Sequence, residues 1–172
     1  MRMSVKKVLP IVVLMQMAFF GACSQIPAGG KVVPGSSEDI KTYPEAKPNS
    51  YWKKVLTPEA YYIMVQKGTE TPFNNPYWNN HEKGTYVSAA TGKPLFSSDA
   101  KFDSGTGWPS FFKPIDPKLI MVVKDNSEGM ERDEVVERST GLHLGHVFDD
   151  GPAPTGLRYC LDSYALKFVK EQ

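Results

Sequence analysis

From residue 51 to residue 169 the chain consists of short apolar runs separated by clusters of glycine, proline, aspartate and asparagine. The strand-like runs are residues 85–88, 119–124, 134–138, 142–148, 157–161 and 164–169. The clusters between them, such as residues 125–129, have the composition and length of hairpin turns. This spacing predicts a mainly β domain with antiparallel sheets and one or two helices at its edge.

One helix is signalled beside these runs. Thr57 is expected to cap it, Pro58 suits its first position, and residues 60, 61, 64 and 65 have core-facing spacing before Gly68 ends it. The aromatic segment 72–80 is expected to be a loop whose rings pack on the domain.

The amino terminus resembles a bacterial lipoprotein signal. A basic start and an apolar run over residues 8–20, too short for a membrane span, precede Gly21, Ala22 and Cys23. We therefore expect a signal peptide over residues 1–22, a tether rich in proline, glycine and serine over 23–50 with Cys23 lipidated, and one domain over 51–172. This organisation predicts an exported, membrane-anchored lipoprotein facing the periplasm; an ordinary signal peptide is the alternative.

Charge and cysteine content exclude several classes of protein. Twenty basic residues against nineteen acidic ones give no excess of the kind that marks a nucleic-acid binder. Two cysteines cannot form a disulfide framework or a four-thiolate zinc site. If Cys23 is acylated, Cys160 is the only free thiol.

The strand around Cys160 alternates with a period of two. Arg158, Cys160 and Asp162 are therefore expected on one face and their neighbours in the core. The arginine would lower the pKa of the thiol, whereas an ionised aspartate would raise it. From this strand alone, a buried and unreactive cysteine remains an equal alternative.

Two more segments carry side chains that could take part in catalysis or ligand binding. His143 and His146 would face opposite sides of a regular strand, but a bulge at Gly145 could bring both to one site. For the pair taken alone, one buried, hydrogen-bonded imidazole and one exposed imidazole is the favoured alternative. Two histidines without thiolates are too few for a zinc site. Gly105 and Gly107 precede Trp108, an arrangement that can hold an indole at the rim of a pocket; a turn with a packed tryptophan is an equal alternative.

Taken together, these segments resemble type B methionine sulfoxide reductases, which reduce the R epimer of methionine sulfoxide. The matching strings, in the order of the family, are GTETPF (68–73), KFDSGTGWPSF (101–111), HLGHVF (143–148), DGP (150–152) and GLRYC (156–160). The resemblance covers residues 52–169. It implies the β-tent fold of that family, and we expect a monomer.

The resemblance implies that Cys160 attacks the sulfoxide sulfur and becomes a sulfenic acid while methionine leaves. The other residues at catalytic positions of the family are His143 and His146 as proton donors, and Asp150 and Arg158, which orient the histidine and support the thiolate. The expected substrate-binding residues are Trp108, as the wall for the methyl group, with Phe148 and Asp162.

Three features depart from the family. The zinc-binding cysteines of many members are replaced by Ser88, Thr91, Glu137 and Thr140, so we expect no metal and no other cofactor. Thr106 occupies the position of the resolving cysteine, so an external, thioredoxin-like or other thiol reductant is expected to recycle Cys160.

The third departure is Asp162, which replaces the usual asparagine. A carboxylate there would repel a thiolate unless it is protonated or points elsewhere; otherwise activity is reduced. Oxidised envelope proteins or peptides are the expected substrates, which would make the chain a protein-repair enzyme of oxidative stress. The alternatives are a cysteine peptidase or acyltransferase, and a non-catalytic lipoprotein module that binds an oxidised or methylated ligand.

Overall fold

The protein is represented by a computed structural model that describes residues 43–172. The predicted signal peptide, Cys23 and most of the predicted tether lie outside the described residues. Within the described part of the chain, no helix is long and apolar enough to cross a membrane.

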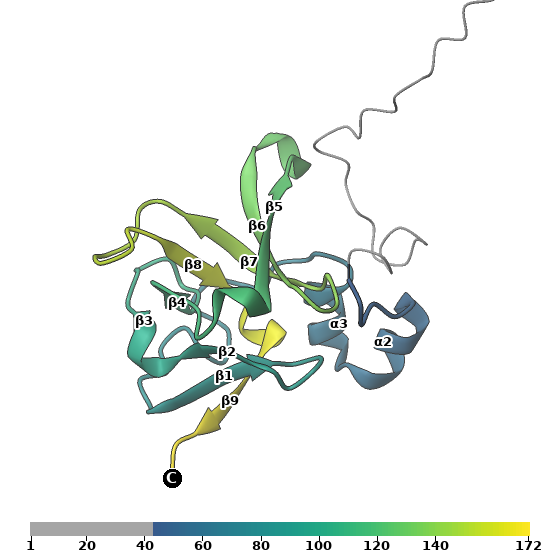
Figure 1. Ribbon diagram of the computed structural model, residues 1–172, viewed down its shortest axis with the longest axis horizontal. Coiled ribbons are helices and arrows are strands. Elements are labelled where there is room, and N and C mark those ends of the chain that lie inside the picture. Colours follow the sequence, from purple (N-terminus) through teal and green to yellow (C-terminus); the bar gives the residue numbers. More distant parts are fainter. Residues whose placement is uncertain (1–42) are drawn as a thin grey trace, which may run out of the picture.

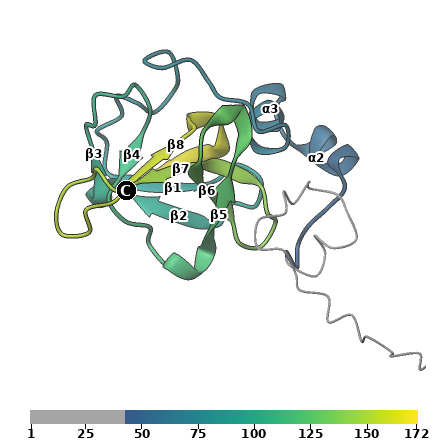
Figure 2. The same ribbon diagram turned by 90° about the horizontal axis from the view of Figure 1, so that it is seen from above.

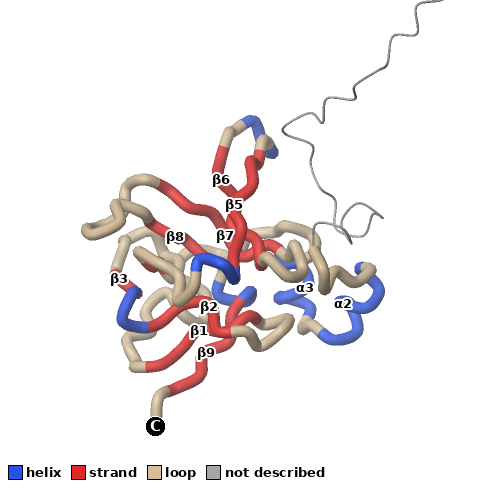
Figure 3. The backbone as a smooth tube through the Cα atoms, in the orientation of Figure 1, coloured by secondary structure: helices blue, strands red, loops and turns tan. Residues whose placement is uncertain are grey.

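Antiparallel strands form two sheets, which confirms the mainly β prediction (Figure 1). The six-stranded sheet has the order β3-β4-β8-β7-β6-β5 and the three-stranded sheet the order β2-β1-β9. The strands are β1 (Gly84–Ser88), β2 (Pro94–Ser97), β3 (Lys101–Phe102), β4 (Ser110–Phe111), β5 (Ile120–Asp125), β6 (Arg132–Glu137), β7 (His143–Phe148), β8 (Arg158–Leu161) and β9 (Leu166–Lys170). The β5–β6 hairpin extends away from the rest of the domain, as the tube in Figure 3 shows.

Two short α-helices lie together on the side of the domain away from β3 and β4 (Figure 2). The predicted helix is α3 (Pro58–Met64), in which the Thr57 hydroxyl accepts a hydrogen bond from the Ala60 amide at 3.2 Å. The capping signals at Thr57 and Pro58 are thus confirmed. The sequence did not signal α2 (Asn49–Val55), which begins inside the predicted tether and buries Trp52.

Packing begins even before α2. The Tyr43 ring is only 4% exposed, and the Glu45 amide donates to the Ser139 carbonyl at 2.7 Å. These contacts hold Tyr43 and Glu45 against the domain, so a free tether would have to lie before Tyr43.

The core lies between the two sheets and is built largely from aromatic rings. Phe96 of β2 packs against Phe111 of β4 and Tyr159 of β8, with ring centroids 4.8 and 5.6 Å apart. Tyr86 of β1 meets Phe111 at 5.0 Å. These contacts bury one face of β8, so its other face is left for polar side chains.

Candidate active site

Cys160 lies on β8 between two neighbouring strands of the six-stranded sheet. Its register partners are Ser110 on β4 and His146 on β7. Side chains that are directly opposite in antiparallel strands point to the same face, so the thiol is flanked by a hydroxyl and an imidazole. Tyr159 and Leu161 are buried on the core face, as the alternation predicts.

Hydroxyl groups surround the sulfur on the β4 side. The Thr106 Oγ1 lies 3.7 Å from the Cys160 Sγ. The Ser104 hydroxyl bonds to those of Thr106 and Ser110 at 2.8 and 2.7 Å. Burial raises the pKa of the Cys160 thiol, and the hydroxyls of Thr106 and Ser110 and the charge of Arg158 offset this effect only in part.

Arg158 shares the polar face of β8 with Cys160 and is fixed by two partners. Its guanidinium forms a two-pronged ion pair with Asp150 at 2.8 and 2.9 Å and lies over the Phe148 ring, with 4.3 Å between its Cζ and the ring centroid. Asp150 makes its ion pair with Arg158, and through this contact it positions the arginine.

The two histidines come together because β7 is irregular at Gly145. Val135 pairs with Gly145 and Val136 with His143, so β7 carries an extra residue at this point. The imidazole rings meet edge to face with centroids 5.3 Å apart. Gly145 has a φ of 149°, and a Cβ there would lie 2.2 Å from the Cys160 carbonyl oxygen, so no other residue fits.

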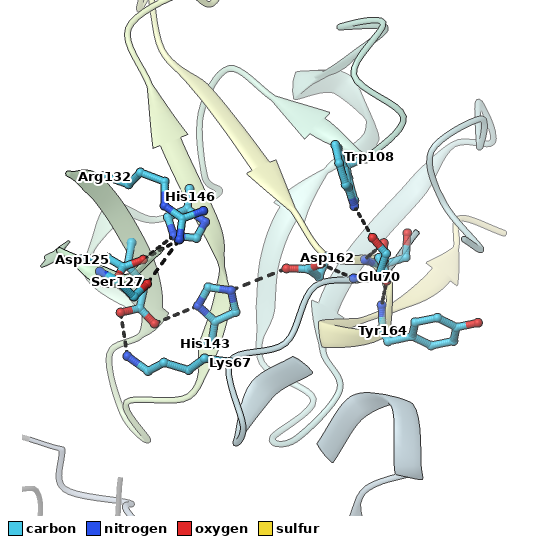
Figure 4. Close-up of polar contacts among 12 residues, drawn as sticks. Lys67, Glu70, Trp108, Asp125, Ser127, Arg132, His143, His146, Asp162 and Tyr164 are labelled. Carbon is cyan, nitrogen blue, oxygen red and sulfur yellow. Dashed lines mark hydrogen bonds and ion pairs between the residues drawn. The ribbon is translucent and has the colours of Figure 1, made fainter. Parts of the chain in front are cut away.

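His143 is buried between two carboxylates (Figure 4). Its Nδ1 lies 2.8 Å from a Glu134 oxygen and its Nε2 lies 3.5 Å from an Asp162 oxygen. Glu134 is also paired with Lys67 at 2.8 Å. Burial lowers the pKa of His143, but Asp162 and Glu134 outweigh it, so the pKa is raised above its usual value.

His146, on β7, faces the β5–β6 hairpin and has a different environment. Its Nε2 lies 3.1 Å from an oxygen of Asp125, which is also bound by Arg132 at 2.9 Å and by the Ser127 amide at 2.9 Å. Burial and the neighbouring charges of His143 and Arg132 lower the pKa of His146, although the bond to Asp125 opposes them.

Trp108 is tied to the segment after α3. Its indole nitrogen donates to the Glu70 carbonyl at 3.2 Å, and the half-buried ring lies on the loop that contains Gly107. The Glu70 carboxyl accepts from the Ser163 and Tyr164 amides at 2.6 and 3.0 Å. Burial raises the pKa of Glu70 to about 7.

Asp162 does not lie free beside the sulfur. One of its oxygens accepts from the Glu70 amide at 3.3 Å, and the other faces His143. Of the alternatives for this departure from the family, a carboxylate directed elsewhere therefore fits the geometry best.

The sequence interpretation missed three carboxylates of this site. Glu134 lies on a predicted strand, whereas Asp125, predicted as the first residue of a turn, is the last residue of β5; only the register of β5, β6 and β7 brings them to the histidines. Glu134 carried one usable signal, since two successive apolar residues after it, Val135 and Val136, indicate a strand that is covered on both faces. Glu70 lies in the string GTETPF that matches the family, but no sequence feature indicated that its side chain belongs to the site.

The positions of the family's zinc ligands come together as a hydrogen-bonded cluster around Glu137. This carboxylate accepts from Ser88 at 2.8 Å, Thr91 at 2.5 Å, Ser139 at 3.2 Å and Thr140 at 3.3 Å. Zinc in structural sites is held by thiolates and imidazoles, so these residues do not fit the metal. Across residues 43–172 there is no group of three or more histidine, cysteine or acidic side chains that could hold a metal ion.

The polar face of the sheet thus joins a thiol, two imidazoles with oppositely shifted pKa values and a fixed guanidinium, with an indole on the neighbouring loop. Such a set can perform nucleophilic chemistry coupled to proton transfer. Cys23, the expected lipid-attachment residue, lies outside the described part of the chain.

Comparison with known proteins agrees with this arrangement. The SelR domain model matches residues 56–170. A peptide methionine sulfoxide reductase MsrB of Leptospira interrogans is 55% identical over 129 residues, which cover 75% of this chain and 98% of the relative. The same-named protein of Methanosarcina mazei is 56% identical over 121 residues, which cover 70% and 86%. This chain therefore belongs to the SelR-domain family of type B methionine sulfoxide reductases.

Proposed function

We propose that this chain reduces methionine-R-sulfoxide to methionine with Cys160 as the nucleophile. The observation that carries the proposal is the register at β8, which pairs Cys160 with Ser110 on one side and His146 on the other. Trp108, held by the Glu70 carbonyl, supplies an apolar wall for the methyl group of the substrate. Arg158, Phe148 and Asp150 form the adjoining side of the site.

The proposed reaction balances without an outside oxidant. Cys160 attacks the sulfoxide sulfur, the oxygen passes to the cysteine sulfur, and the products are a sulfenic acid and the thioether of methionine. The thiol proton ends on the transferred oxygen. A histidine that can hold this proton in transit lowers the barrier, because sulfoxide oxygen leaves poorly until it is protonated.

The proposed recycling uses an external thiol. Residues 43–172 contain no cysteine besides Cys160, and Thr106 faces the sulfur where a resolving thiol would be useful. A donor thiol would attack the sulfenic acid, release water and form a mixed disulfide, which a second thiol would reduce. A thioredoxin-like protein or a small dithiol could supply both.

We also propose that the domain works without zinc, as a monomer at a membrane surface. The hydroxyl groups bound to Glu137 support the first point, since they leave no thiolate for a metal. The signal-like residues 1–22 and Cys23 support export to the periplasm and a lipid anchor. Oxidised envelope proteins are then the nearest substrates.

A stereochemical assay tests the reaction. The purified protein is incubated with the R or the S epimer of a methionine sulfoxide peptide and a small dithiol, and the reduced, methionine-containing peptide is measured. We expect turnover of the R epimer alone, none for Cys160→Ser, and full turnover for Cys23→Ser. Equal turnover of both epimers, or turnover by the Cys160 variant, would contradict the proposal, and ligand binding without any turnover would favour a non-catalytic module.

Recycling and anchoring need separate measurements. Comparing a thioredoxin-like donor with a small dithiol in the same assay identifies the class of reductant. Metal analysis of the purified protein should find less than stoichiometric zinc. In cells, the full chain should fractionate with membranes and Cys23→Ser should not; identical fractionation of the two would refute the anchor.

A further inference from the structure

His143 lies between two groups that can only accept hydrogen bonds when ionised. The Glu134 oxygen is 2.8 Å from Nδ1, and the Asp162 oxygen is 3.5 Å from Nε2 on the opposite side of the ring (Figure 4). A neutral imidazole carries one N–H, whereas an imidazolium carries two. Only the imidazolium can present an N–H to both carboxylates.

The charges around His143 also favour the imidazolium. The side chains of Glu134, His143 and Asp162 are only 3%, 4% and 6% exposed, so an unpaired charge there would be costly. With Lys67 on the outer oxygen of Glu134, the four groups alternate in sign and sum to zero. A neutral His143 would leave the Asp162 carboxylate buried without a cation beside it.

The charges around His146 favour its neutral form. Its Nε2 faces the Asp125 carboxylate, which Arg132 already pairs, and the His143 ring lies 5.3 Å away between centroids. Two nearby cations disfavour a third charge on His146, so the neutral ring with its proton on Nε2 satisfies Asp125 at the lowest cost. This tautomer leaves the lone pair on Nδ1.

We propose that Asp162 is a positioning residue that sets the protonation of both histidines: it holds His143 as imidazolium and, through that charge, keeps His146 neutral. The site then contains one stored proton on His143 and one imidazole, His146, able to accept a proton from the face that carries Cys160. Histidines whose environments separate their proton affinities divide acid and base roles in this way.

With an asparagine at position 162, His143 would favour the neutral form and no charge would be buried without a partner. Its amide can donate to a neutral His143 Nε2 while its oxygen still accepts from the Glu70 amide. Lys67 and Glu134 would remain as a pair. Asp162→Asn therefore changes the charge pattern with little change of shape, which makes it the informative variant.

The other charged and titratable groups around the two histidines are Glu134 and Arg132 on β6, Asp125 on β5, Cys160 on β8, and Lys67 and Glu70 in the segment after α3. None of these changes in the Asp162 variant. The inference rests on the proposed function only for the use made of the proton, because the protonation states can be measured without a substrate.

The test is nitrogen-15 NMR of the three histidine rings over pH 5–9. In the unaltered protein, His143 should be doubly protonated at pH 6.5, and His146 should be neutral with its proton on Nε2. In Asp162→Asn, the titration midpoint of His143 should fall by about one pH unit or more, a tenfold change, and that of His146 should rise. The exposed His81 serves as the internal reference.

Two further variants complete the test. Glu134→Gln should also lower the His143 midpoint, because it removes the other carboxylate. Asp116→Asn, at the cap of a remote turn, should move neither histidine. A neutral His143 at pH 6.5 in the unaltered protein, unchanged midpoints in Asp162→Asn, or midpoints that shift in the same direction would each overturn the inference. Loss of sulfoxide turnover alone would bear only on the proposed function.

Discussion

At the scale of single residues, the groups around Cys160 act in opposite directions on its ionisation. Burial raises the pKa of the thiol, while the Thr106 and Ser110 hydroxyls and the Arg158 charge lower it by a smaller amount. The resting thiol therefore keeps its proton at neutral pH. This suits a reaction in which the same proton leaves on the transferred oxygen, and it makes adventitious attack by the thiolate on other electrophiles slow.

Thr106 offers a direct test of the recycling route. Its Oγ1 lies 3.7 Å from the Cys160 sulfur, on a loop with glycines on both sides, Gly105 and Gly107. A thiol at this position needs only a small movement of the loop to reach bonding distance. We expect Thr106→Cys to form an intramolecular disulfide after one turnover with substrate, seen by mass spectrometry as the loss of both free thiols.

Thr85→Cys is a suitable control, because Thr85 lies on β1 in the other sheet. This variant should keep its new thiol free and show a sulfenic acid or a mixed adduct at Cys160. If Thr106→Cys behaves in the same way, position 106 is not placed to resolve the intermediate.

The sequence identifies the residues of β8 better than those of β5 and β6. Alternation alone predicts that Arg158 and Cys160 share a face, because strand geometry fixes that relation locally. Glu134 and Asp125 reach the histidines only through pairing between strands, and pairing depends on the bulge in β7. No local pattern in the sequence encodes a contact of that kind.

At the scale of elements, the close approach of β7 and β8 depends on Gly145. A Cβ there would lie 2.2 Å from the Cys160 carbonyl oxygen and 2.8 Å from the Leu161 Cα. Gly145→Ala should therefore push the two strands apart, cost about 1–3 kcal/mol of stability, and remove most sulfoxide turnover by separating His146 from Cys160. Urea unfolding and the R-epimer assay measure the two effects.

Gly92→Ala separates the steric effect from the backbone effect. Gly92 also has a positive φ, 74°, but a Cβ there meets no atom within 4 Å. The Gly92→Ala variant should be slightly less stable than the unaltered protein and should keep full sulfoxide turnover. A Gly145 variant that is indistinguishable from this control would show that the approach of β7 to β8 is not needed.

A second element-scale feature is the Glu137 cluster, which links β1 and the turn after it in one sheet to β6 in the other. Glu137→Ala removes the shared acceptor of four hydroxyls and should cost about 2–4 kcal/mol, measured by urea unfolding. Turnover at low temperature should persist, since the cluster holds none of the reacting groups. Ser139→Ala, which removes one donor of the four, should cost about 1 kcal/mol; an equal loss in both variants would contradict a cooperative cluster.

Among the elements, the sequence predicts the long strands and α3 but not β2, β3, β4 or α2. The strands β3 and β4 contain two residues each, too few for any periodicity. Residues 164 and 165, predicted as the start of the last strand, belong instead to a 3-10 turn over Ser163–Ala165, because the Glu70 carboxyl accepts from the amides of Ser163 and Tyr164. Here a distant side chain overrides local preference.

At the scale of the whole molecule, ionisable groups, most of them buried, join segments that are far apart in the chain. The segment after α3 supplies Lys67 and Glu70, β6 supplies Glu134, β7 supplies His143, and Asp162 follows β8. The stability of the fold therefore depends on pH through these contacts. The lowered pKa of Glu134 makes stability fall as the solution is acidified below about pH 4.5.

Glu70 acts in the opposite direction. Its pKa is raised from 4.5 to about 7, so the folded protein binds this proton more tightly than the unfolded chain does. Stability must then fall as the pH rises through that interval. His143, whose pKa is also raised, extends the fall above its ordinary value of 6.5, while His146, with a lowered pKa, opposes it.

Glu70→Gln isolates one part of this dependence, because the amide resembles the protonated carboxyl and does not titrate. Between pH 5 and pH 8, the unaltered protein should lose about 1–2 kcal/mol more stability than the variant. Urea unfolding of both proteins at several pH values measures this difference, and the contributions of the two histidines cancel in it. Parallel curves across that range would mean that Glu70 is already ionised at pH 5, and that its two amide donors stabilise the carboxylate more than burial disfavours it.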